Sequence, residues 1–208
     1  MSDSRVSLLA AATEEFAARG LHGTRIQAIV QRSGVNERMI YHHFGGKEGL
    51  YKAVLGDVFE QLAQLWLPIV EAAGQMSPYE GMRSALAGYA DLFMARPAWL
   101  GLFMHESMNG WKAAPLPTTE QVAPLRDLYE RGQQEGVFRT DIPIEIAHAT
   151  AISAIFGLTA FAPRGAQLGF PGAGLRTEET EAADSGFAVT RDLIISQLLD
   201  GMTGPRSS

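Results

Sequence analysis

The sequence of 208 residues contains no cysteine, which excludes a disulfide framework and a thiolate metal site. It also has no segment in which apolar and polar residues alternate as they do in β-strands. The apolar stretch from Leu8 to Ala12 is followed closely by Glu14 and Glu15, so it is too short for a secretory signal. These absences favour an all-α protein that works in the cytoplasm.

The signatures of common enzymes are missing too. No HExxH, GxSxG or P-loop pattern occurs, and the run Gly45-Gly46-Lys47 lacks the frame of a phosphate-binding loop. His42 and His43 are adjacent, so their side chains cannot share one face of a helix and bind one metal ion. We therefore predict no enzymatic activity, no cofactor and no metal site.

A membrane-spanning segment is not expected either. The charge-free run from Ile146 to Ala162 has 17 residues. As a helix that rises about 1.5 Å per residue, it falls short of the roughly 30 Å of a bilayer core. It also contains the polar residues His148 and Thr150. Because a helix that is apolar on all sides is otherwise buried on all sides, we predict burial between its own core and a second subunit.

The net charge of −6 is unevenly distributed along a chain of ordinary globular composition, 46% hydrophobic and 19% charged. Residues 1–52 carry seven basic and five acidic residues, a net charge of +2, whereas residues 53–208 carry ten basic and eighteen acidic residues. A polyanion such as DNA would be attracted by the first part and repelled by the second. Because +2 is modest, we expect binding to depend on the geometric fit of a dimer more than on bulk charge.

The stretch that organises the chain, residues 24–47, predicts two short helices joined by a tight turn. Thr24, with a glutamine three residues later, has the form of a capping box at the start of the first helix. Gly34 ends this helix, because glycine adopts the left-handed conformation without steric cost. Asn36 is a favoured N-cap for a second helix from about Glu37 to Phe44. This is the outline of a helix-turn-helix, although an ordinary helical hairpin would share it.

Five short motifs lie in and around this stretch. They are Gly23-Thr24, the apolar set Ile26, Ala28 and Ile29, the turn Gly34-Val35, the run Tyr41-His42-His43-Phe44, and the run Lys47-Glu48-Gly49-Leu50. Together they resemble the TetR (tetracycline-repressor) family of transcriptional regulators over roughly the first fifty residues. Four residues differ from those frequent in the family, so the base contacts of relatives are not carried over: Asn36, Arg38, Met39 and Gly46.

The resemblance implies an all-α fold of about nine helices in two domains. A three-helix DNA-binding domain would occupy residues 1–46, and an effector-binding and dimerisation domain would occupy residues 47–208. It also implies a homodimeric regulator, more often a repressor, that binds a near-palindromic double-stranded DNA operator and releases it when a small apolar or amphipathic effector binds. The competing interpretation is a helical enzyme or binding protein whose hairpin is only structural.

Nine residues are predicted to contact DNA. The resemblance places Thr24, Tyr41, His42 and Lys47 at backbone phosphates, and Arg25 is added beside Thr24. The residues placed for base edges are Asn36, Glu37, Arg38 and Met39. Arg38 has the side chain that pairs in a bidentate manner with guanine.

Cap signals and helical periodicity predict the other helices at about residues 4–19, 47–68, 78–95, 98–109, 118–136, from 141–143 onward, and 181–199. The glycine-rich segment 165–177 is predicted to be a loop. In TetR-like proteins the last two helices of each subunit form a four-helix dimer interface. The resemblance implies the same here, with these residues at the interface: Ile152, Ile155, Leu193, Ile194, Gln197 and Leu198.

A second cluster is rich in Trp, Met and Phe with interspersed polar groups, which is typical of an apolar ligand pocket and equally of plain core packing. The candidate effector-binding residues are Trp66, Tyr89, Phe93, Phe103, Met104, His105, Met108, Asn109, Tyr129 and Phe156. Glu106 is a candidate for orienting the effector together with His105 and Asn109, and the alternative is that it faces solvent, because a buried charge without a partner is costly. The helix from Lys47 to Leu65 is expected to carry the signal, as the only continuous connection to the DNA-binding domain.

Overall fold

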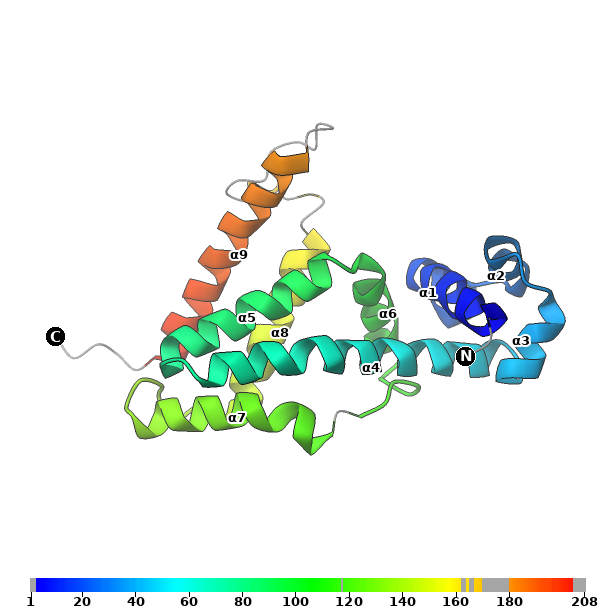
Figure 1. Cartoon of the computed structure of the whole chain (residues 1–208). Helices are drawn as coiled ribbons and strands as arrows, with labels where there is room; N and C mark the ends of the chain where they lie inside the picture. Colours follow the sequence, from blue (N-terminus) through cyan, green and yellow to red (C-terminus); the bar gives the residue numbers. More distant parts are fainter. Residues whose placement is uncertain (1–2, 117, 162–163, 165–166, 170–179, 204–208) are drawn as a thin grey trace. The chain divides into compact units, whose positions relative to one another are not determined.

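The computed structural model describes residues 3–116, 118–161, 164, 167–169 and 180–203, the last stretch without side chains before residue 187. Within these residues the chain forms nine α-helices and no strand, which confirms the all-α prediction (Figure 1). The helices are α1 (Asp3–Gly23), α2 (Ile26–Ser33), α3 (Glu37–Phe44), α4 (Lys47–Gly74), α5 (Pro78–Met94), α6 (Pro97–Met108), α7 (Thr119–Gln134), α8 (Ile144–Phe161) and α9 (Thr180–Met202). Most of the predicted loop 165–177 lies outside the described residues.

Contacts divide the chain into two compact units. The first comprises Met1–Gln64 and Ala95–Pro117, and the second comprises Leu65–Met94 and Thr118–Ser208. This division differs from the predicted boundary after residue 46, because α6 groups with the DNA-binding helices and α4 contributes to both units. The chain therefore passes between the units within α4, after Met94 and after Pro117. Of these three crossings, only the one within α4 is made by a continuous helix.

The core of the first unit is built by the apolar faces of the first helices. Leu8, Phe16, Ile29, Ile40 and Leu50 have no exposed area. Buried residues recur every four positions at Leu8, Ala12 and Phe16 in α1 and at Leu50, Val54 and Val58 in α4, so both helices turn one stripe inward. Burial of side chains of this size stabilises the unit by about 1.5–3 kcal/mol each.

Helix ends follow their local signals in most places. Gly34, at φ 67°, ends α2 and donates its N–H to the Val30 carbonyl at 2.9 Å. The side chain of Asn36 accepts from the Arg38 N–H at 2.9 Å and caps α3, as predicted. Pro68, however, does not end α4, which continues to Gly74. Pro68 lies on the exposed side of the helix, where water can replace the missing hydrogen bond.

The second unit packs α5, α7, α8 and α9 around one core with the last part of α4. At its centre the fully buried ring of Tyr129 stacks on Phe138, with ring centroids 5.2 Å apart. The Gln121 side chain accepts from the Thr118 N–H at 2.8 Å, which confirms the predicted start of α7.

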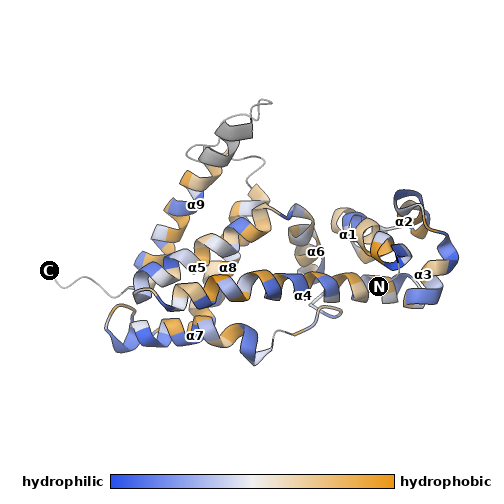
Figure 2. Cartoon of the chain, in the orientation of Figure 1, coloured by the Kyte–Doolittle hydropathy of each residue, from blue (hydrophilic) through white to orange (hydrophobic). Residues whose placement is uncertain are grey.

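Two helices, α4 and α8, are long and apolar enough to cross a membrane by length and composition. In α4 polar and apolar residues alternate along the helix, as Figure 2 shows. In α8 one stripe enters the core of the second unit through Ala147, Ala151 and Ile155. Core packing on that stripe accounts for part of the apolar composition of α8.

Candidate nucleic-acid interface

The short helices α2 and α3 carry several hydrophilic residues, which are coloured blue on the ribbon of Figure 2. Helix α3 buries Ile40 completely and leaves Arg38, Tyr41 and His42 exposed. Glu37 and Met39 are half-buried. Because the cap on Asn36 occupies its carbonyl oxygen, its NH2 group is the part left for an outside acceptor. This arrangement has the outline of a recognition helix that carries its polar side chains on one face.

Lys47 connects the start of α4 to the start of α2. Its ammonium group donates to the Thr24 carbonyl at 3.0 Å. Two further N–H donors of the ammonium remain for an anion. The same place holds the amino terminus of α2, whose first N–H groups and helix dipole favour negative charge. Lys47 and the exposed Arg25 therefore lie where a phosphate is expected.

Thr24 does not have the predicted position. Its side chain is only 2% exposed, and its hydroxyl donates to the carbonyls of Gly20 (2.7 Å) and Glu15 (3.0 Å) instead of capping α2. The N-cap residue is Arg25, without a side-chain hydrogen bond. The predicted capping box is therefore wrong, and the buried hydroxyl is not available to a phosphate. The side chain ties α2 to α1 across the interior.

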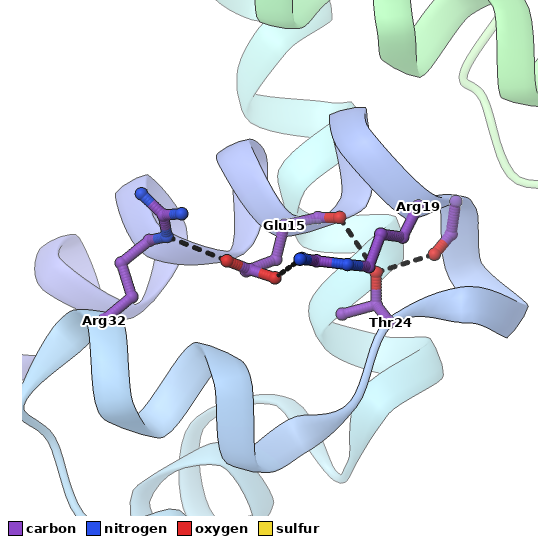
Figure 3. Close-up of polar contacts among 5 residues, drawn as sticks. Glu15, Arg19, Thr24 and Arg32 are labelled. Carbon is purple, nitrogen blue, oxygen red and sulfur yellow. Dashed lines mark hydrogen bonds and ion pairs between the residues drawn. The ribbon is translucent and has the colours of Figure 1, made fainter.

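A buried carboxylate completes this junction, as Figure 3 shows. Glu15 lies in α1 with its side chain almost fully buried, and it pairs with Arg19 of the same helix and with the Arg32 Nε of α2 at 2.9 Å. A buried carboxylate needs such partners, because removing a charge from water is costly. Sequence reasoning missed this set, and the positions of Glu15 and Arg32 offer no local signal for it.

We expect Thr24→Val to weaken the fold without changing the electrostatics of DNA binding. The isosteric change removes the buried hydroxyl that donates to the Gly20 and Glu15 carbonyls, so we expect a loss of about 1–3 kcal/mol in the free energy of unfolding. The slope of DNA affinity against salt should stay at the wild-type value. Thermal unfolding and DNA titrations at several salt concentrations measure both, with the exposed Thr119→Val as control. A slope lower by about one would instead place Thr24 at a phosphate.

The end of the recognition helix is held by the start of α1. The Ser4 hydroxyl and the His43 Nε2 lie 3.1 Å apart in a hydrogen bond. The Arg5 guanidinium lies 5.5 Å from the centre of the Phe44 ring, a cation–π contact. These contacts fix the orientation of α3, and they join residues too far apart in sequence for a local pattern to reveal them.

The predicted effector-binding residues fall into both units. Five belong to the first unit, where Phe103 stacks on Phe59 at 4.9 Å, His105 packs beside Gly20, and Asn109 ends α6. Met104 and Met108 are exposed, Met108 by 72%, so the prediction that Met108 lines an enclosed pocket is wrong. Helix α6 turns its inner face to α1 and leaves these two methionines outside.

The other five candidates belong to the second unit. Four of them form a continuous line of ring contacts at 5.0 to 5.2 Å, in the order Trp66, Tyr89, Phe93 and Phe156. Burial raises the pKa of the Tyr89 hydroxyl. The fifth, Tyr129, is a core residue whose hydroxyl donates to the Ile142 carbonyl at 3.2 Å. The line of four rings is thus the part of the predicted cluster that the structure brings together.

An apolar groove of about 350 Å³ runs between α8 and α9 in the second unit. It is lined by Ile142, Ile146, Ala147, Thr150, Ala154, Ile194, Gln197, Leu198, Gly201 and Met202. Three predicted interface residues therefore line the groove, namely Ile194, Gln197 and Leu198. Leu193, next to Ile194 in the sequence, is 53% exposed. Ile152 is half-buried, and Ile155 is fully buried in the core, which leaves it no surface for a second subunit.

Sequence reasoning predicted a second contact face on α8 but placed it at Ile152 and Ile155, and it missed Ile146. Ile146 is 59% exposed, and it lies one turn apart from Thr150 and two turns from Ala154 on the groove side. The sequence does contain this face, because Ile146, Thr150 and Ala154 recur every four residues, one position before the core residues Ala147, Ala151 and Ile155. In a helix that is apolar all round, however, periodicity does not show which stripe is covered.

Two family models match the chain. The one described as bacterial regulatory proteins, tetR family, matches residues 8–54, and the one described as tetracyclin repressor-like, C-terminal domain, matches residues 78–169. Among similar proteins, the HTH-type transcriptional repressor NicS of Pseudomonas putida is 30% identical over 155 residues, which cover 70% of each chain. The HTH-type transcriptional repressor KstR2 of Mycolicibacterium smegmatis is 26% identical over 152 residues, 69% of this chain and 72% of KstR2. The HTH-type transcriptional regulator RutR of Escherichia coli K12 is 28% identical, with 62% of this chain spanning 58% of RutR.

Solved structures show the same fold. A TetR family transcription regulator from Marinobacter aquaeolei superposes with a TM-score of 0.69 and 18% identity, over 97% of this chain and 96% of the other. The ketosteroid transcriptional regulator KstR2 of Mycobacterium tuberculosis gives a TM-score of 0.66 and 19% identity, over 99% of this chain and 97% of the other.

Proposed function

This chain belongs to the TetR family of bacterial regulatory proteins and is a DNA-binding transcriptional regulator, and we propose that it is a repressor released from its operator by a small apolar effector. One observation carries the DNA-binding part of this proposal. Helix α3 is capped by Asn36, anchored by the buried Ile40, and presents Arg38, Tyr41 and His42 to the outside. We assign the chain to the cytoplasm, where bacterial regulators meet DNA, and assign it no enzymatic role and no membrane contact.

The proposed contacts with DNA fall into two groups. Phosphates would be bound by Lys47, Arg25, Tyr41 and His42, which are exposed or half-buried around the starts of α2 and α4 and the outer face of α3. Base edges would be read by Asn36, Glu37, Arg38 and Met39 in the first turn of α3. Arg38 is exposed, so its guanidinium can form a bidentate contact with guanine.

We expect Arg38→Ala to relax sequence preference at one position of each half-site. Loss of a bidentate contact should reduce discrimination there by about 1–3 kcal/mol. Lys47→Ala should weaken binding to all sequences alike and lower the salt slope by about one. Selection of sites from random duplexes, followed by mobility-shift titrations with the DNA flanking the gene, measures both effects.

Arg83→Ala serves as the control, because it removes an exposed basic residue that belongs to the second unit and not to the DNA-binding unit. It should bind as the wild type does. If Arg38→Ala and Lys47→Ala also bound with unchanged affinity, preference and salt slope, α3 would not be the recognition helix.

The effector is proposed to bind in the second unit. The line of rings from Trp66 to Phe156 supports this, because aromatic side chains around a single hydroxyl suit an apolar or aromatic molecule with one hydrogen-bonding group. The relative KstR2 is named a ketosteroid regulator, which fits an apolar effector class. Release requires that the effector bind better to a conformation that does not match DNA, with a coupling of about 1–3 kcal/mol.

We also propose a homodimer that pairs the α8–α9 faces of two subunits. The open apolar groove and the exposed Leu193 and Ile146 support this, since apolar surface of this kind is unusual on a monomer. A two-fold dimer would bring two recognition helices to a near-palindromic operator.

A further inference from the structure

Helix α6 is part of the DNA-binding unit, although the matching family model assigns residues 78–169 to the C-terminal domain. At Gly101 the backbone of α6 meets that of α1, because a Cβ atom there would lie 2.6 Å from the Ala17 carbonyl oxygen. One turn further, the His105 ring lies against Gly20. Close approach of two helix backbones requires small residues at the contact. Helix α6 thus packs closely on α1 at Gly101 and at His105.

The end of α6 carries a buried carboxylate that the DNA contacts do not use. Glu106 is 2% exposed, and none of the ion pairs among the described residues involves it. Its Oε1 accepts from the Tyr51 hydroxyl of α4 at 2.9 Å, and its Oε2 accepts from the N–H groups of Ala113 (3.0 Å) and Ala114 (3.2 Å). The alternative that Glu106 faces solvent is therefore wrong, since three hydrogen bonds replace the water it has lost.

The turn after α6 is held in a strained conformation. Trp111 has φ 57°, the only positive φ of a described residue other than glycine. Its N–H donates to the Glu106 carbonyl at 2.9 Å, and its ring meets Phe103 edge-on at 5.7 Å. Phe103 in turn stacks on Phe59 of α4. A bulky residue in the left-handed region persists only where its surroundings hold it. Glu106 organises this turn through both its carbonyl and its carboxylate.

Tyr51, the donor of the bond to Glu106, lies on α4 close to the residues proposed to contact DNA. Tyr51 lies one turn after Lys47, whose ammonium holds the Thr24 carbonyl at the start of α2. Its ring packs edge-on against the buried Phe16 of α1 at 4.9 Å. Burial and the hydrogen bond to Glu106 raise the pKa of the Tyr51 hydroxyl, so it remains a donor at neutral pH. A series of hydrogen bonds thus runs from α2 through the first turns of α4 to α6 and its turn.

We propose that Tyr51 and Glu106 are positioning residues for DNA binding, because their hydrogen bond fastens α6 and the turn 109–114 to the amino-terminal turns of α4. Neither residue contacts DNA in this proposal. They keep the helices that do in one arrangement, so that less conformational freedom is lost on binding. The structural unit needed for DNA binding would then include Glu106 of α6 in addition to the N-terminal helices.

The test uses Tyr51→Phe and Glu106→Gln in the full-length protein. Tyr51→Phe keeps the ring against Phe16 and removes only the donor. The probe is the duplex that the wild-type protein selects from random DNA. We expect both variants to bind it about three- to tenfold more weakly. We also expect faster amide hydrogen exchange in residues 107–116 and in the first turns of α4.

Tyr129→Phe is the matched control, because it removes an equivalent hydroxyl, bonded to the Ile142 carbonyl, from the second unit. It should leave DNA affinity unchanged. Wild-type affinity in Tyr51→Phe would overturn the proposal, even if exchange became faster, since the bond would then be merely structural. An equal loss of affinity in Tyr129→Phe would also overturn it, because the effect would then follow from general stability. If Glu106→Gln did not fold, Tyr51→Phe would decide alone.

Discussion

Leu193→Glu should convert the proposed dimer into a monomer and reduce operator affinity by about two to four orders of magnitude. The side chain is 53% exposed in the single chain, so the substitution leaves the fold of the subunit intact. In a two-fold interface each residue appears twice, so two carboxylates would be buried at the same time. Burying such charges without partners costs several kcal/mol per ion, more than the loss of apolar contact alone. The large effect on DNA follows because the second recognition helix is no longer held near its half-site.

Sedimentation velocity measures the assembly, and mobility shift with the selected duplex measures binding. Val122→Glu is the control, since it places the same charge on an exposed apolar position of α7 in the same unit. Ile146→Glu, on the α8 side of the groove, should act as Leu193→Glu does. A dimer of unchanged strength in both variants would show that the α8–α9 face is not the interface.

Gly101→Ala should destabilise the first unit, although alanine is the better helix former. In an open helix this change stabilises by about 1 kcal/mol. Here the new Cβ would lie 2.6 Å from the Ala17 carbonyl oxygen and 3.1 Å from its carbon. These are backbone atoms, so no side chain can rotate away, and α6 must shift from α1. Overpacking of this kind costs about 1–3 kcal/mol, which outweighs the gain in propensity.

Gly56→Ala is the matched control within the same unit. No heavy atom lies within 4 Å of a Cβ built at Gly56, so the propensity gain should appear there undiminished. Thermal unfolding should therefore shift in opposite directions for the two variants, by about 4–8 °C for each kcal/mol in a domain of this size. If Gly101→Ala were as stable as Gly56→Ala, α6 would not be closely packed on α1.

Local signals determined the helix-turn-helix and much of the helix order. Asn36 caps α3, Gly34 ends α2, and Gln121 accepts from the Thr118 N–H at the start of α7, as their positions predicted. Ile29, the last of the apolar set at the start of α2, is fully buried, and so is Ile40 of α3. These features depend on residues within four positions of one another, so a single sequence contains all that they need.

Only the tertiary structure decided which side chains meet across helices. Thr24 has the form of a cap, but two carbonyls of α1 are better placed for its hydroxyl. The sequence left open whether Glu106 is buried or faces solvent, and Tyr51, fifty-five positions away, supplies the partner that permits burial. Ile155 and Ile146 are equally apolar, yet one enters the core and the other stays exposed. Each outcome depends on how helix faces pack, and packing is set by contacts between residues distant in sequence, which helical periodicity and caps do not specify.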